Sequence, residues 1–136
     1  MNFANLRTTA RSFLDLLPSL FFAVTFLQAG IDKLVDRPGQ LSYFRSHFEK
    51  TFVSRIAEPL FWAVTALELA SGILAALGAL QILLGGGKTF ALWGIVVSSL
   101  TVLCLFLGQR LSKDYSGAAG LVPYFIVGVL SLYVLI

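Results

Sequence analysis

Charged residues are missing from long stretches of this sequence. None occurs between Lys88 and Arg110, and none follows Asp114. Two further stretches are also nearly free of charged residues: 16–31 carries none and 59–87 carries one. A helix of about 20 residues crosses the ~30 Å hydrocarbon layer of a bilayer. The first two stretches have this length, and the other two run from 16 to 29 residues. The sequence therefore predicts four membrane spans.

The composition excludes a water-soluble domain. Of the 136 residues, 57% are hydrophobic and only 12% are charged, and the mean hydropathy is +0.86. Soluble domains are far more polar. We therefore expect an all-α fold, a four-helix transmembrane bundle that forms a single integral membrane domain over residues 1–136. The expected spans are 13–34, 59–84, 89–108 and 117–136, with a very tight turn at the three glycines 85–87.

The charged segment between the first two spans has the pattern of an amphipathic helix. Pro38 and Gly39 are expected to break the first helix. Beyond them, over approximately residues 40–56, apolar residues recur every three or four positions and polar residues fill the other face. This pattern predicts an interfacial helix that lies in the headgroup plane or packs over the mouth of the bundle. Its apolar positions are Leu41, Phe44, Phe48, Phe52 and Ile56.

Charge and the scarcity of ligating residues limit the partners of this chain. The net charge of +3 comes with no basic stripe outside the apolar runs, so we expect membrane lipid as a partner and no nucleic acid. With one cysteine, Cys104, and one histidine, His47, we expect this chain alone to hold no disulfide, metal, haem or iron–sulfur cofactor. Any redox role then requires another subunit of a larger membrane protein complex.

Lysine and arginine predict the orientation in the membrane. Arg7, Arg11 and Lys88 lie on the side of the two termini, and the other seven of the ten basic residues lie in the two opposite loops. The positive-inside rule therefore places segments 32–58 and 109–115 in the cytoplasm.

Glu68 lies inside the second predicted span. It is about ten residues, or roughly 15 Å, from the start of that span, too deep to reach the headgroups. An isolated carboxylate in hydrocarbon is costly, so we expect Glu68 to be protonated or to pair with Thr25, Gln28 or Lys33. Two roles stay open for it: a hydrogen bond that holds the bundle together, or a proton-handling or ligand-binding carboxyl.

Polar residues on the first span are spaced so that they share one helix face. Thr25, Gln28, Asp32 and Asp36 recur at intervals of three, four and four. In an antiparallel hairpin of the first two spans, Glu68 lies level with about Thr25, so we expect this stripe to run from the interface towards Glu68. Lys33 either neutralises the neighbouring aspartates or serves only as an interface anchor.

Small residues on the second span predict close helix packing. Ser71 and Ala75 share a row at four-residue spacing, and Gly78 lies beside it. Small side chains allow the backbones of membrane helices to approach each other.

Two segments together resemble the DoxX family of small four-helix membrane proteins. They are FLQAGIDKL at 26–34, which ends the first span, and ELASGIL at 68–74 in the second span. The resemblance covers the first two spans and the segment between them, whereas the last two spans match only in length and hydropathy. The family pattern falls on four residues, with the two glycines as packing positions: Gly30, Lys33, Glu68 and Gly72.

The resemblance implies a location in the bacterial cytoplasmic (inner) membrane and an association with membrane redox systems. Relatives in the family include thiosulfate:quinone oxidoreductases and methylamine-utilisation membrane proteins. No catalytic residue is assigned by it.

Two functions of different classes stay open. The first is an accessory or quinone-associated subunit of a membrane redox complex, in which Glu68, Gln28 and Asp32 hydrogen-bond the carbonyls of a quinone in an apolar slot. The second is a structural subunit that packs on and stabilises a larger membrane complex without chemistry of its own. A carrier or channel is least favoured, because four short spans with one buried charge offer little for a gated pathway.

Overall fold

The computed structural model describes residues 2–136, and helices cover most of this range. Within it, four helices are long and apolar enough to cross a membrane. The predicted all-α fold with four transmembrane helices is confirmed, and the protein is a multi-pass membrane protein. The elements follow in the order α1 (Phe3–Val35), α2 (Arg37–His47), the 3-10 turn η1 (Ser54–Ile56), α3 (Ala57–Leu83), α4 (Thr89–Leu111) and α5 (Tyr115–Leu135).

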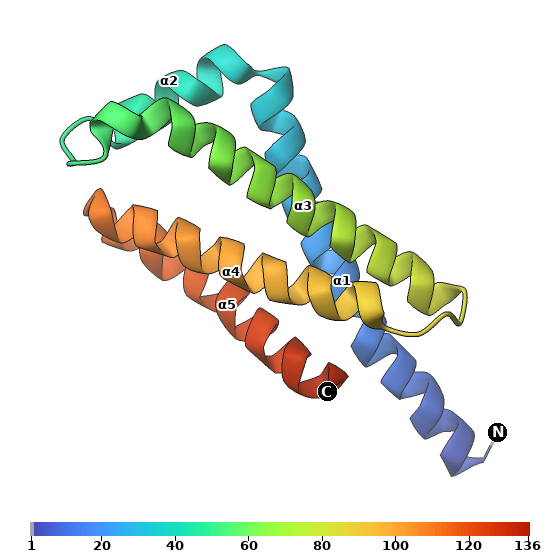
Figure 1. The fold of residues 1–136 in the computed structure, drawn as a ribbon. Helices are drawn as coiled ribbons and strands as arrows, with labels where there is room; N and C mark the ends of the chain where they lie inside the picture. Colours follow the sequence, from blue (N-terminus) through green and yellow to red (C-terminus); the bar gives the residue numbers. More distant parts are fainter. Residues whose placement is uncertain (1) are drawn as a thin grey trace.

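The helix α1 crosses the other spans obliquely, and its first turns project beyond them (Figure 1). α3, α4 and α5 lie side by side in alternating directions (Figure 1). α1 begins well before residue 13, where the first span was expected, because nothing in 3–12 breaks a helix. Asn2 caps it: the side-chain oxygen accepts a hydrogen bond from the N–H of Asn5 at 2.9 Å.

Glycines bring the backbones of α3 and α4 into contact. A β-carbon on Gly94 would lie 2.7 Å from the backbone nitrogen of Ala75. One on Gly78 would overlap the backbone of Ala91. Membrane helices gain van der Waals contact from such close approach. These glycines therefore hold α3 and α4 together near the turn that connects them.

The contact between α1 and α3 fixes the register of these two helices. A β-carbon on Gly72 would lie 2.7 Å from the backbone nitrogen of Leu27, and one on Gly30 would lie 2.5 Å from the side chain of Leu69. Leu69 is therefore level with Gly30 in the last turns of α1. The structure buries all five residues that were expected to mediate packing: Gly30, Ser71, Gly72, Ala75 and Gly78.

The turn between α3 and α4 is tight, as the three glycines predict. Gly85 and Gly87 have φ angles of +74° and +99°, which glycine adopts without the strain of a side chain. Gln81 closes the turn, because its side-chain amide donates to Gly86 O at 3.0 Å and its Oε1 accepts from the N–H of Phe90 at 3.0 Å.

The interfacial helix starts earlier than predicted. α2 begins at Arg37, so Pro38 and Gly39 do not separate two elements but lie in its first turn. Proline is well tolerated there, because the N–H that it lacks has no partner in the first turn of a helix. The break between α1 and α2 falls instead at Asp36.

The same helix also ends earlier, at His47, so the prediction of one helix over 40–56 is wrong. The backbone N–H and the hydroxyl of Thr51 both donate to Phe48 O, at 3.0 and 2.8 Å. Such local bonds compete with helix continuation and turn the chain back towards α3. Phe52, which was expected on the apolar face, is 83% exposed as a result.

Candidate functional site

Glu68 pairs with Lys33 across the contact between α3 and α1. Lys33 Nζ donates to Glu68 Oε1 at 3.2 Å and lies 2.9 Å from Oε2. The Lys33 side chain is 16% exposed and that of Glu68 only 3%. The pairing gives the buried carboxylate the countercharge that an acid in hydrocarbon needs. Lys33 is one of the three partners that the sequence suggested for Glu68.

The predicted level of Glu68 along α1 is wrong by more than one helical turn. With Leu69 beside Gly30, Glu68 lies level with the last turns of α1 and not with Thr25. The difference arises because the first turns of α3 continue past the end of α1 and lie against α2. Glu68 is therefore deep along α3 but close to the end of α1, which is why the long side chain of Lys33 reaches it.

The polar stripe on α1 does not face Glu68. Gln28 and Asp32 are exposed on the outer face of α1, and the Thr25 hydroxyl donates to Phe21 O at 2.8 Å. The buried face of α1 presents Phe22, Phe26 and Gly30 instead. Large apolar groups and close-packing glycines gain most from the bundle interior, whereas polar groups near a helix end can reach the headgroups.

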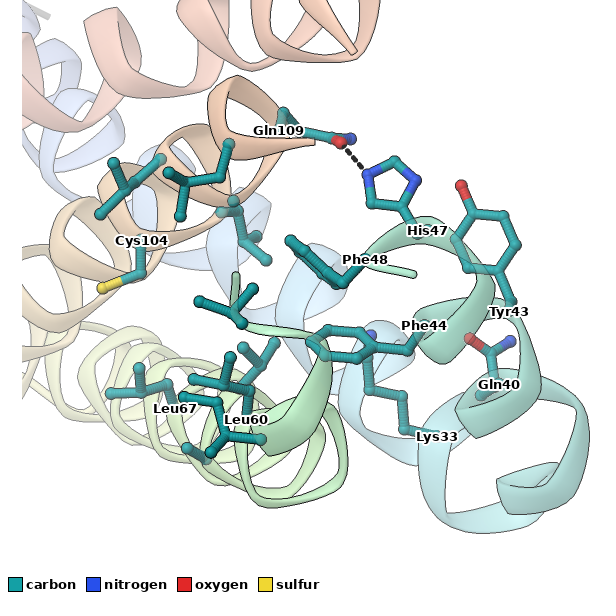
Figure 2. Close-up of a pocket in the computed structure, with 18 of the residues that line it drawn as sticks. Lys33, Gln40, Tyr43, Phe44, His47, Phe48, Leu60, Leu67, Cys104 and Gln109 are labelled. Atoms are coloured by element: carbon teal, nitrogen blue, oxygen red, sulfur yellow. Dashed lines mark hydrogen bonds between the residues drawn. The ribbon is translucent and has the colours of Figure 1, made fainter. Parts of the chain in front are cut away.

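A cavity of about 620 Å³ lies beside the ion pair, between α2, α3 and α4. Lys33 lines it, while Glu68 stays outside its wall. Polar and aromatic side chains of α2 stand on one side of the cavity, and Leu60 and Leu67 of α3 and Cys104 of α4 stand on the other (Figure 2). Sites for small molecules typically measure about 300–1,000 Å³ and are mostly apolar, so this cavity is our candidate functional site.

Aromatic side chains from α2 and the following turn form one wall of the cavity. Phe48 is buried, and its ring would lie 3.2 Å from a β-carbon on Gly108 of α4. Its centroid is 4.8 Å from that of Phe44, whose ring contacts Phe61 of α3 edge to face at 5.8 Å. Two of the predicted apolar positions, Phe44 and Phe48, thus do face the bundle.

His47 fastens α2 to the end of α4. Its Nε2 lies 2.6 Å from Gln109 Oε1 and 2.8 Å from Ser112 Oγ. Because an amide oxygen only accepts, Nε2 carries the hydrogen in this arrangement (Figure 2). Tyr43 stacks on the imidazole with 5.7 Å between the ring centroids. Sequence reasoning missed this cluster, since no pattern links His47 to partners 62 and 65 residues further along.

A second ion pair, between a buried aspartate and a lysine whose side chain is 41% exposed, lies towards the other end of the bundle. Asp15 on α1 is 5% exposed, and its Oδ2 lies 3.1 Å from Lys88 Nζ at the start of α4. Nearby, Arg11 donates to Val134 O at the end of α5, at 3.0 Å. The sequence does carry a signal for this pair, because Asp15 interrupts an apolar run as Glu68 does.

A scan of protein-family models and searches of curated proteins and of solved structures found no match to this chain. The resemblance to the DoxX family therefore stays a prediction that rests on segments 26–34 and 68–74. The four residues on which its pattern falls lie together where α1 and α3 meet: Gly30, Lys33, Glu68 and Gly72.

Proposed function

We propose that this protein binds a quinone beneath α2 and serves as an accessory subunit of a membrane redox complex in the bacterial cytoplasmic membrane. The observation that carries the proposal is the 620 Å³ cavity, which is apolar over most of its lining and has the Lys33 ammonium in its wall. A quinone needs an apolar slot for its ring and first tail carbons, and a few hydrogen-bond donors for its carbonyls.

Lys33 is the donor best placed for a quinone carbonyl. An ammonium has three N–H donors, and the contacts with the two oxygens of Glu68 leave one hydrogen free for the cavity. Glu68 balances the charge of the ammonium, so the paired lysine suits a neutral acceptor. In this proposal Glu68 is a positioning residue and does not touch the quinone. Gln28 and Asp32, which face outward, take no part.

The second carbonyl has a donor at the α2 side of the cavity, the hydroxyl of Tyr43. Tyr43 and His47 line this side, and the rings of Phe44 and Phe48 offer flat apolar surfaces to a planar ligand. A quinone ring held between Lys33 and this side satisfies both of its carbonyls without entering the bundle core.

The electrons come from a partner subunit in this proposal. With one histidine and one cysteine in the chain, a haem or iron–sulfur centre has to be held by another protein. The cavity supports the binding of a quinone, and the resemblance of segments 26–34 and 68–74 supports the association with a redox complex.

The test is to purify the protein in mild detergent with the complex that accompanies it, extract the lipid fraction and quantify quinone per protein chain. We expect close to one quinone per chain for the unmodified protein. Lys33→Met removes a charged donor worth about 1.5–3 kcal/mol, so the dissociation constant for quinone should rise at least about tenfold and clearly less quinone should co-purify. Lys50→Met is the matched control, because Lys50 is exposed and lies outside the cavity lining.

Lys33→Met also removes the countercharge of Glu68 and so can misfold the protein. A second variant separates this effect from the loss of quinone binding. Leu67→Trp leaves the ion pair intact and fills the cavity, so it should lose quinone to the same extent. Unmodified protein without quinone, or both variants with undiminished quinone, would overturn the proposal. A complex that keeps this chain and its full activity without quinone would instead establish the structural-subunit alternative.

A further inference from the structure

We infer that the cavity takes a membrane-dissolved amphiphile whose tail leaves the protein sideways between α3 and α4, beside Cys104. The inference rests on the proposed quinone site and adds the route by which a long-tailed ligand enters and sits in it. It follows from the distribution of polar lining residues, from the place where the cavity meets the surface, and from the packing of α3 against α4.

Polarity changes from one side of the cavity to the other. The polar lining residues come from the end of α1 and from α2, and one joins them from the end of α4: Lys33, Gln40, Tyr43, His47 and Gln109. They gather on one side, whereas the opposite side is formed by leucines of α3 and by Cys104 (Figure 2). A ligand that satisfies both sides has a polar head under α2 and an apolar body that points along α3 and α4.

The apolar side of the cavity reaches the outer surface of the bundle. Ala63 on α3 and Cys104 and Leu107 on α4 line the cavity and are exposed at the same time. Cys104 and Leu107 belong to the charge-free run of α4, so the surface that they form faces hydrocarbon. The cavity therefore opens to the lipid and not to water on this side.

The opening follows from the way α3 and α4 pack. Their backbones touch at Gly78 and Gly94, and the hydroxyls of Ser71 and Thr101 lie 2.8 Å apart. Beyond this level the two helices diverge towards the end that carries α2 (Figure 1). Phe48 lies in this widening space on the α2 side, with its ring next to Gly108 of α4.

The head of the amphiphile is a neutral hydrogen-bond acceptor. Within residues 2–136, the lining of the cavity contains no carboxylate, and its one charged side chain, Lys33, is already neutralised by Glu68. A phosphate head would bring negative charge without an unpaired cation to receive it, which is costly away from water. A quinone with an isoprenoid or alkyl tail has the required chemistry.

Cys104 allows the inference to be tested on the unmodified protein, because it is the one cysteine in the sequence. The protein in lipid nanodiscs is alkylated with N-ethylmaleimide, alone or with one of two fully substituted quinones that do not react with thiols: decylubiquinone, which has a tail, and duroquinone, which has none. Binding of each quinone is measured separately by equilibrium dialysis. At about ten times the dissociation constant, the free-site fraction falls about elevenfold.

We expect decylubiquinone to slow the alkylation of Cys104 at least about fivefold under these conditions, and duroquinone to leave the rate nearly unchanged although it binds. If decylubiquinone binds and the rate is unaffected, the tail leaves elsewhere; the inference is then overturned while the proposed quinone site stands. Equal protection by both quinones also overturns it. If neither quinone binds, the proposed function itself fails.

A tryptophan in the opening provides an independent check. Ala63→Trp should block the passage of a tail and weaken decylubiquinone at least about tenfold, or about 1.4 kcal/mol, while duroquinone binds as before. Ala66→Trp is the matched control, because Ala66 is an exposed alanine one turn further along α3 and outside the lining. Equal effects of the two variants on decylubiquinone would contradict the route between α3 and α4.

Discussion

Replacing Lys33 with methionine should destabilise the protein far more than replacing Lys33 and Glu68 together. The single change removes the countercharge from a carboxylate that is only 3% exposed. Breaking one side of a buried ion pair in this way costs about 3–5 kcal/mol. Replacing both residues by methionine removes the orphaned charge and fills the space with apolar atoms, which is often neutral or stabilising.

The measurement is the free energy of unfolding in a double-mutant cycle, obtained by denaturant titration of the purified protein in detergent and followed by circular dichroism. We expect a coupling energy of at least about 2 kcal/mol between the two positions. Glu68→Gln should fall between the extremes, because an amide keeps the size of the side chain and accepts one hydrogen bond from Lys33. If the single and double methionine variants are equally stable, the reasoning about this pair is refuted.

Three further predictions concern packing, the α2 contact and orientation. Gly78→Leu should cost about 1–3 kcal/mol or more by forcing α3 and α4 apart, seen as loss of monodisperse protein in gel filtration; unchanged elution and stability would contradict it. His47→Ala should raise hydrogen exchange in α2 about tenfold by removing roughly 1–1.5 kcal/mol of hydrogen bonding, and equal protection in both proteins would show that α2 is held otherwise. In a Cys104→Ser background, a cysteine at Asn2 should react with an external reagent and one at Lys50 should not, because the positive-inside rule places 32–58 in the cytoplasm; the reverse pattern would invert the orientation.

The spans could be predicted from the sequence because length and charge decide them. The charge-free run between Lys88 and Arg110 becomes α4 almost unchanged, and the glycines at 85–87 form the turn that their lack of side chains permits. Close-packed positions such as Gly78 follow from the same kind of local reasoning. These features depend on residues near each other in the chain.

The rotation and depth of α1 could not be predicted in this way. Spacing shows that Gln28 and Asp32 share a face, but it does not say which face the other helices cover. Phe22, Phe26 and Gly30 form an equally regular row, and that row enters the bundle. The partner of Glu68 depends on the path of the segment between α1 and α3. The helix in this segment ends at His47, where the Thr51 hydroxyl donates to Phe48 O just beyond it. Such long-range geometry leaves little trace in the local pattern.

The positions of the two ion pairs along α1 bear on the bilayer thickness that suits this protein. Both pairs include α1, through Asp15 at one end and Lys33 at the other, and the helix between these residues rises about 27 Å. In bilayers with a thicker hydrocarbon layer at least one pair would lie further below the headgroups, and the lipid around the protein would have to thin or the helices tilt less. We therefore expect the protein to be most stable in bilayers of short to medium acyl chains and to lose stability as the chains lengthen.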